Sequence, residues 1–290
     1  MNSKKEINGF VKYTKKPNTI SKGTLYTKII KVNVLNKDKE RLVRVYLPSN
    51  YDFNNPNKRF PVMYMMDGKN LFDDHTSFVG EWHVDETIEK YVEQNGKGLI
   101  VVGIDSAQTE KDRMLEMLIK AKGNELKGKK DAKETFGYGD ILADYIFNEL
   151  KPMIDDTFYT LKDKENTAVG GSSMGGLYAF YLGMKYYEKV SFSLCFSPAF
   201  LLYKAKFFKE ELSKGIKENK KYGKFFFFCG GIGLEKRILP LTNYTVNYLS
   251  KIGFDEKQVR YIYDSSAIHN EGPWTTYYDV GIKCWGILEK

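Results

Sequence analysis

One serine of this 290-residue chain stands in a pattern suited to nucleophilic catalysis. Ser173 lies between Gly171 and Gly175 in the pattern G-x-S-x-G, after an expected strand at residues 167–170 and before an expected helix at 177–187. A sharp strand-to-helix turn of this kind lifts the central hydroxyl above a sheet, and glycines stand where side chains would collide. We therefore predict Ser173 as the nucleophile.

The same turn offers a hydrogen-bond donor for a developing negative charge. Met174 follows the serine at the expected helix N-terminus, where its backbone N–H can stabilise an oxyanion. Ser172 would be the nucleophile only if the register were shifted, and it lacks the flanking glycines. We predict the Met174 N–H as one oxyanion donor.

A serine hydroxyl needs a general base, and histidine is the usual one because it titrates near neutrality. The chain has three histidines, His75, His83 and His269. In folds that carry this kind of turn, the three catalytic residues follow one another along the chain in the order serine, acid, histidine. Only His269 follows Ser173, just past the last expected strand, so we predict His269 as the base. His75 and His83 are expected to be structural or to line the cleft.

The acid that orients the base should follow the preceding strand. Glu235 is the first carboxylate after the expected strand at residues 224–229, and we predict it as the acid. Its alternative role is that of a surface glutamate opening a helix, where the helix dipole favours a negative charge. Asp264, at the end of the last expected strand, is the second candidate, and Asp255 and Glu256 in an expected turn are less favoured.

The elements that must position these residues follow from the spacing of apolar residues. Two alternating stretches come first, at residues 24–35 and 41–47, separated by the turn-like cluster Asn36-Lys37-Asp38. Further strands are expected at 60–66, 99–104, 167–170, 190–196, 225–229 and 259–263, and helices at 82–92, 140–154, 177–187, 239–252 and 274–288.

Apolar strands that alternate with helices predict a doubly wound, mainly parallel α/β sheet, here with antiparallel N-terminal strands. We expect a single domain over residues 1–290, because no linker or fixed-period repeat divides the chain. In such sheets, function gathers at the carboxyl ends of the strands.

Composition narrows the functional classes. The net charge of +8 comes mainly from lysines that are scattered among acids, with no nucleic-acid-binding signature, so we expect no nucleic-acid partner. No segment has 18 consecutive apolar residues and the N-terminus has no apolar signal region, so we expect no membrane partner and a cytoplasmic protein. Three cysteines in apolar runs predict reduced core thiols.

Residues 120–133 hold six lysines against two acids. They fall between an expected strand and an expected helix, on the carboxyl side of the sheet, and read as an exposed loop. A long loop there could guide an anionic ester towards the cleft. The simpler alternative, a solvated surface with no role, is slightly favoured.

Several segments resemble the putative-esterase family of α/β-hydrolases, which includes feruloyl, acetylxylan and siderophore esterases, S-formylglutathione hydrolases and mycolyltransferases. The segments run in order through nearly the whole chain: RVYLP (44–48), FPVMYMMDGKNLFD (60–73), GGSSMGG (170–176), CFSPAF (195–200) and HNE (269–271) with Trp274. The resemblance implies the α/β-hydrolase fold. It also implies a second oxyanion donor, a backbone N–H at Lys69 or Asn70; Lys69 stands where glutamine is frequent, which is harmless if only the main chain acts.

These features together predict a carboxylic-ester hydrolase that works through an acyl-enzyme, on a small-molecule or carbohydrate ester such as a feruloyl, acetyl-sugar or siderophore-type ester. An acyltransferase with the same triad is one alternative. A non-catalytic binding protein on the same scaffold is another, although the intact Ser173 and His269 argue against it. We expect no cofactor and no metal, because the histidines are dispersed and no Cys/His cluster has ligand spacing.

Overall fold

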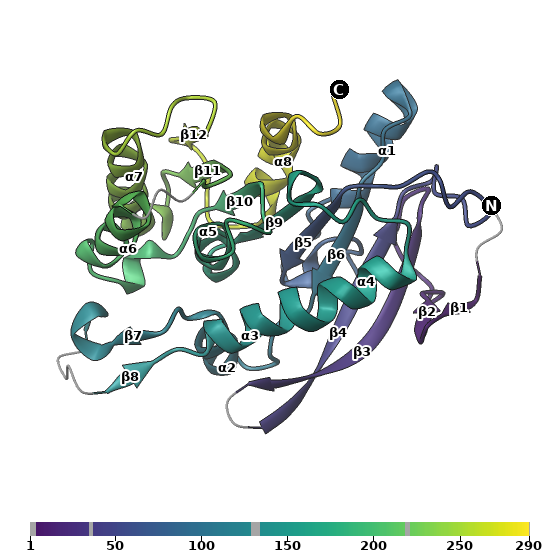
Figure 1. Cartoon of the computed structure of the whole chain (residues 1–290), viewed down its shortest axis with the longest axis horizontal. Helices are drawn as coiled ribbons and strands as arrows, with labels where there is room; N and C mark the ends of the chain where they lie inside the picture. The colour runs from purple at the N-terminus through teal and green to yellow at the C-terminus, as the bar shows by residue number, and fades with distance from the viewer. Residues whose placement is uncertain (1–3, 35–36, 129–133, 218–220, 290) are drawn as a thin grey trace.

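The computed structural model describes residues 4–34, 37–128, 134–217 and 221–289 (Figure 1). Ten strands form one sheet in the order β1-β2-β3-β4-β6-β5-β9-β10-β11-β12. The strands of this sheet are β1 (Glu6–Ile7), β2 (Phe10–Lys12), β3 (Thr24–Val34), β4 (Lys37–Leu47), β5 (Val62–Met66), β6 (Ile100–Ile104), β9 (Thr167–Ser172), β10 (Phe192–Phe196), β11 (Lys224–Gly230) and β12 (Val259–Asp264).

The type of strand pairing changes once across the sheet, from antiparallel to parallel. Strands β1 to β4 pair antiparallel with one another, and β4 pairs antiparallel with β6. From β6 to β12 every pairing is parallel. The predicted α/β class, with a mainly parallel sheet and antiparallel N-terminal strands, is therefore confirmed.

Alternate residues of the central strands enter two separate cores, as the two-residue period of a strand requires. In β11, Phe225 and Phe227 join one core, and Phe226 and Phe228 the other. Helices α1 and α8 cover the second core, while the remaining long helices cover the first; Figure 1 shows α3 and α4 crossing in front of the sheet. The helices are α1 (Val84–Asn95), α2 (Glu110–Met117), α3 (Gly139–Tyr145), α4 (Lys151–Thr157), α5 (Met174–Lys185), α6 (Lys206–Lys217), α7 (Glu235–Lys251) and α8 (Glu271–Trp285).

Short helical segments complete the chain. The predicted helix at 140–154 is interrupted, because a π-helical segment, η3 (Ile146–Leu150), joins α3 to α4, whose first turn contains Pro152. Pro152 has no N–H to donate, which disturbs the regular bonding of the preceding turn. The 3-10 segments are η1 (Gly68–Asn70), η2 (Gly123–Glu125), η4 (Lys164–Asn166) and η5 (Phe200–Leu202).

The expectation of an exposed loop at residues 120–133 is wrong for its first part. There β7 (Ala121–Lys122) pairs with β8 (Thr135–Phe136), and η2 follows β7. Ala121 and Leu126 are buried, since their side chains join the first core and anchor the segment. Residues 129–133, with Lys129, Lys130 and Lys133, lie outside the described residues.

The expected turn at Asn36-Lys37-Asp38 is also corrected in part. Strand β4 already begins at Lys37, and Asp38 pairs with Asn33 across the hairpin. Asn36 lies outside the described residues. The polar side chains of this cluster suggested a longer turn than the backbone makes.

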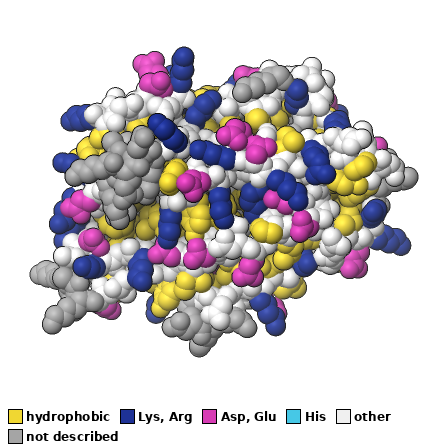
Figure 2. Space-filling model, in the orientation of Figure 1, with side chains coloured by type: hydrophobic (Ala, Val, Ile, Leu, Met, Phe, Trp, Pro, Cys, Tyr) yellow, Lys and Arg dark blue, Asp and Glu magenta, His cyan; other side chains and the backbone are white. Residues whose placement is uncertain are grey.

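The surface and the cysteines follow the sequence expectations. In Figure 2, lysine and arginine side chains are spread over the visible face with acids between them. All three cysteines are free thiols; Cys195 and Cys229 are buried and Cys284 is half-buried. None of the helices in the described part of the chain is both long and apolar enough to cross a bilayer.

Candidate active site

Ser173 occupies the turn between β9 and α5 in a backbone conformation that few L-residues adopt, with φ 54° and ψ −115°. Its N–H donates to Phe196 O (2.9 Å), and its carbonyl accepts from Ala199 N (2.9 Å). These bonds to the end of β10 hold the strained turn in place. A strained backbone persists only where the surrounding structure holds it, and such residues cluster at functional sites.

The glycines around Ser173 are there for steric reasons. A Cβ on Gly171 would lie 2.7 Å from the carbonyl carbon of Gly175, and one on Gly176 would lie 2.4 Å from Phe196 O. Met174 is the first residue of α5, so its N–H has no partner within the helix and points out of its N-terminus. The turn therefore presents a partly exposed hydroxyl beside an available N–H.

Glu235 and His269 form a direct pair at the ends of β11 and β12. Their Oε1 and Nδ1 atoms lie 2.8 Å apart, with the Glu235 side chain fully buried and that of His269 only 15% exposed. The other oxygen of Glu235, Oε2, accepts from Gly230 N (3.0 Å) and Cys229 Sγ (3.1 Å). Since Nδ1 faces the carboxylate, Nε2 of His269 is left for other chemistry.

The surroundings of Glu235 favour its charged form. Burial alone raises the pKa of Glu235, but hydrogen bonds from His269, Ser197 and Cys229 outweigh it and leave the pKa below its usual value. The carboxylate therefore stays ionised at neutral pH, where it can fix the orientation of the imidazole and stabilise its protonated form.

Asp264, the second candidate for the acid, is engaged elsewhere. Its Oδ1 accepts from the Ser266 hydroxyl (2.7 Å), and its Oδ2 accepts from the Tyr277 hydroxyl (3.0 Å). Asp255 accepts from Lys257 N and Gln258 N within its own turn. Of the candidate acids, Glu235 is the one that the structure places against His269.

Two residues link the serine turn to the histidine, and sequence reasoning assigned no role to either. Trp274 packs edge-on against the His269 ring at 5.1 Å between centroids, and its indole N–H donates to the Ser197 hydroxyl (3.1 Å). Ser197 directly follows Phe196, whose carbonyl accepts from Ser173 N. Ser197 and Trp274 both lie in segments that resemble the putative-esterase family, and this resemblance is the sequence signal that points to them.

The segment after β5 forms the other wall of the site. It runs through η1, and a Cβ on Gly68 would lie 2.6 Å from the backbone of Gly103, so a larger residue would push the segment away. The N–H of Asn70 donates to Asp67 O (2.9 Å), while the Asn70 side chain donates to Glu271 Oε1 (3.3 Å). The two candidates for the second oxyanion donor, the backbone N–H groups of Lys69 and Asn70, therefore differ. The Asn70 N–H is already bonded to Asp67 O.

Arg113 holds the start of the segment after β5 through Asp67. Its guanidinium donates to both carboxylate oxygens of Asp67 at 2.7 Å, and the Ser106 hydroxyl also donates to Asp67. Burial raises the pKa of Asp67, but the bonds from Arg113 and Ser106 outweigh it and leave the pKa below its ordinary value. Asp67 is held in the left-handed region, at φ 58°, immediately before η1.

Replacing Arg113 by methionine should lower the free energy of unfolding by about 3 kcal/mol at pH 7, because a buried carboxylate loses its partner. The Asp67 pKa is lowered in the folded state, so the pair stabilises above the unfolded pKa, about 3.9, and this stabilisation is lost as pH falls through the folded pKa. Denaturant unfolding at pH 7 and pH 3 should therefore show a smaller difference at pH 3.

The exposed pair Lys22–Glu93, with side chains 70% and 55% exposed, provides the control. Lys22→Met should leave the unfolding free energy nearly unchanged, because solvent screens an exposed ion pair. An Arg113→Met effect no larger than this would show that the Asp67 ion pair does not brace the segment.

The other two histidines pair with neighbouring acids. His75 pairs with Asp73 (3.2 Å), and His83 lies between two glutamates at the start of α1. Of the lysine-rich residues, Lys120 lines a different hollow of about 400 Å³, bordered by Asp140, Tyr181 and Lys185.

The comparison with known families agrees with this geometry. Residues 35–224 match the model of the family described as "Putative esterase", which is more than half of the chain. The chain belongs to the putative-esterase family. Membership supports ester hydrolysis as the activity of this esterase.

Solved structures share the fold of this esterase at low sequence identity. The BES protein from Bacillus cereus is 18% identical with a TM-score of 0.66, over 94% of this chain and 98% of that one. A ferulic acid esterase is 16% identical with a TM-score of 0.64, over 92% and 99%. The siderophore hydrolase EstB from Aspergillus nidulans is 15% identical with a TM-score of 0.64, over 92% and 97%. At these identities the likeness establishes the α/β-hydrolase fold.

Proposed function

We propose that this esterase is a serine carboxylesterase that uses Ser173 as nucleophile, His269 as general base and Glu235 as the orienting acid. The observation that carries the proposal is the 2.8 Å contact between His269 Nδ1 and the buried, ionised Glu235. It leaves Nε2 as the basic atom, at the same edge of the sheet as the strained Ser173 turn.

The mechanism is a two-step acyl transfer. His269 takes the proton of the Ser173 hydroxyl as the oxygen attacks the ester carbonyl, and a tetrahedral oxyanion forms. His269 then gives this proton to the leaving alcohol, and an acyl-enzyme remains. Water, activated by His269, attacks the acyl-enzyme and releases the acid and free Ser173.

The oxyanion is stabilised by two backbone donors. Met174 N–H, at the start of α5, is the first, because the helix N-terminus adds a partial positive charge. We assign Lys69 N–H as the second in preference to Asn70, since the Asn70 N–H already donates to Asp67 O. The Lys69 side chain is not needed for this role.

The substrate is proposed to be a small-molecule or carbohydrate ester that carries an apolar group near the scissile bond. Large apolar side chains are exposed on the segments that carry the proposed site residues: Phe78 (81%), Val79 (61%), Ile232 (43%), Leu234 (41%) and Ile268 (46%). Phe78 N donates to the Asn70 side chain and the Phe78 ring lies beside Lys69 Nζ, so Phe78 stands next to η1. Ile232 N donates to Ala267 O, which places the Ile232 backbone near the segment that carries His269. Exposed apolar side chains that gather on one part of a surface are typical of a binding site.

A panel of p-nitrophenyl, feruloyl, acetyl-sugar and siderophore-type esters tests this proposal. We expect higher kcat/KM for esters with larger apolar groups than for acetates. Phe78→Ser should lower kcat/KM for the larger esters by about fivefold to tenfold, the value of roughly 1 kcal/mol of apolar contact, and leave acetates nearly unchanged.

Ile29→Ser is the matched control, because Ile29 is 62% exposed on β3, away from the catalytic segments. It should change neither class of ester. If both classes of ester respond alike to Phe78→Ser, the exposed apolar side chains near the site do not select the substrate. In the ester panel, free acid as the product supports hydrolysis. Transfer of the acyl group to an added alcohol in preference to water would favour an acyltransferase. No turnover of any ester would favour a binding protein.

A further inference from the structure

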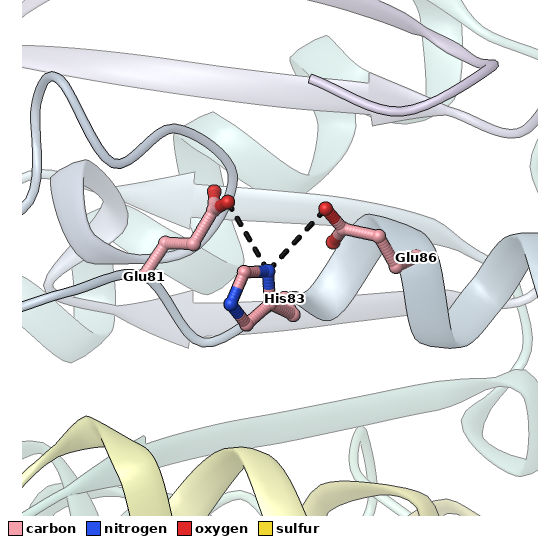
Figure 3. Close-up of side chains that lie close together, drawn as sticks. All are labelled: Glu81, His83 and Glu86. Atoms are coloured by element: carbon pink, nitrogen blue, oxygen red, sulfur yellow. Dashed lines mark hydrogen bonds and ion pairs between the residues drawn. The ribbon is translucent and has the colours of Figure 1, made fainter. Parts of the chain in front are cut away.

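Three side chains with metal-binding atoms converge at the start of α1. Glu81 comes from the segment before the helix, His83 is its N-cap, and Glu86 lies in its first turn. In Figure 3 the two carboxylates stand on either side of the imidazole, both turned towards its Nδ1 atom. The two nearer carboxylate oxygens lie 3.1 Å (Glu81 Oε1) and 3.3 Å (Glu86 Oε1) from Nδ1.

These separations match the spacing of ligands around one cation. Zinc binds imidazole nitrogen and carboxylate oxygen at about 2.1 Å, so two ligands at tetrahedral or octahedral angles lie about 3.0–3.4 Å apart. One ligand atom from each residue lies within 4.8 Å of the other two, so only a small movement would bring all three onto one ion. The cluster thus has the size of a coordination sphere.

The two carboxylates of the cluster have too few hydrogen-bond donors and positive charges around them. The Glu81 side chain is 1% exposed and its Oε2 has no hydrogen-bond partner among the described residues. Nδ1 of His83 carries at most one proton, and it faces two carboxylates. Buried carboxylates without full compensation are costly, and they are found paired or bound to metals.

A neighbouring acid also lacks a full set of hydrogen bonds. Asp85 is fully buried; its Oδ2 accepts from Ser21 N (2.8 Å), but its Oδ1 has no partner among the described residues. The helix dipole favours an acid at Glu86 in the first turn of α1, but it does not account for a buried Glu81 outside the helix.

We propose that Glu81, His83 and Glu86 bind one divalent transition-metal ion such as Zn²⁺. One imidazole and two carboxylates form a mixed nitrogen and oxygen donor set, which zinc accepts and which magnesium and calcium use rarely. His83 is 46% exposed, so water can reach the ion and complete its coordination.

A bound ion would brace one wall of the active site. Trp82 lies between the two ligands Glu81 and His83. Its backbone N–H donates to Asn70 O (2.9 Å), and its ring packs against that of Trp274 with centroids 5.6 Å apart. The ion would therefore fix the segment that follows η1 relative to α1. This role is one of positioning, and zinc takes no part in the proposed ester chemistry.

Calorimetric titration of the chelator-treated protein with Zn²⁺ tests the site. We expect one equivalent to bind and to raise the melting temperature, since the ion binds the folded state. Glu81→Gln and His83→Gln should each weaken binding by about tenfold or more and abolish the rise. Glutamine keeps the shape of Glu81 and removes a poorly compensated buried charge, so the Glu81→Gln variant should fold.

His75→Gln is the matched control, because His75 is similarly exposed (44%) and paired with one acid in the same segment. It should bind Zn²⁺ as the wild type does. Absence of binding to the wild type, or equal binding by the Glu81→Gln variant, would overturn the proposal. Loss of binding in His75→Gln alone would place zinc at a different, surface site. Each readout is independent of esterase activity.

Discussion

Ser173→Ala is expected to reduce kcat for ester hydrolysis by on the order of 10³ to 10⁶, because the covalent step loses its nucleophile. The variant should fold normally, since alanine removes one partly exposed hydroxyl and leaves the backbone bonds from Ser173 N and O in place. Steady-state kinetics on a p-nitrophenyl ester, together with thermal unfolding, measure both effects.

Ser172→Ala is the control for this experiment. Ser172 is the last residue of β9, adjacent to Ser173 and 7% exposed, but it is not in the strained turn. We expect its variant to keep most of the activity. A folded Ser173→Ala variant with unchanged kcat, or a larger loss in Ser172→Ala, would show that the nucleophile is a different residue.

His269→Ala should be about as damaging as Ser173→Ala, because the nucleophile and its base act as a unit. Glu235→Gln should lower kcat by about 10²- to 10⁴-fold, because the neutral amide no longer stabilises a protonated imidazole. Asp264→Asn is the matched control, since Asp264 bonds to Ser266 and Tyr277 and should leave kcat nearly unchanged.

Kinetics of the three variants, beside their unfolding curves, test this arrangement. If Asp264→Asn were more damaging than Glu235→Gln with both proteins folded, Asp264 would be the acid. If His269→Ala kept most of the activity, the base would have to be another residue and the proposed mechanism would fail.

Much of the fold could be predicted because its signals are local. Buried strands such as β5 and β11 are continuous apolar runs, and the glycines around Ser173 mark the turn by steric need alone. The candidates for the acid could be narrowed to Glu235, with Asp264 second, because chain order and strand ends limit where the acid can lie. What the sequence left open was which carboxylate touches His269, since that depends on side-chain direction at the ends of two strands.

The remaining features depend on contacts between distant segments. Helix α2 is short and its apolar spacing is weak, so neither the helix nor the bond from its Arg113 to Asp67 could be predicted. The group of Glu81, His83 and Glu86 was missed for a different reason. A sequence marks a metal site most clearly by a Cys/His cluster with ligand spacing, whereas this group places one histidine between two acids, with Glu81 buried by the surrounding fold.

Labelling with a fluorophosphonate probe, followed by mass spectrometry of the modified peptide, tests the central claim most directly. The probe forms a covalent bond with a serine only where the hydroxyl is activated by a base and the oxyanion is stabilised. We predict one label on the wild-type protein, at Ser173, and none on the Ser173→Ala or His269→Ala variant. A label on another residue, or equal labelling of the Ser173→Ala variant, would contradict the assignment of this serine as the nucleophile.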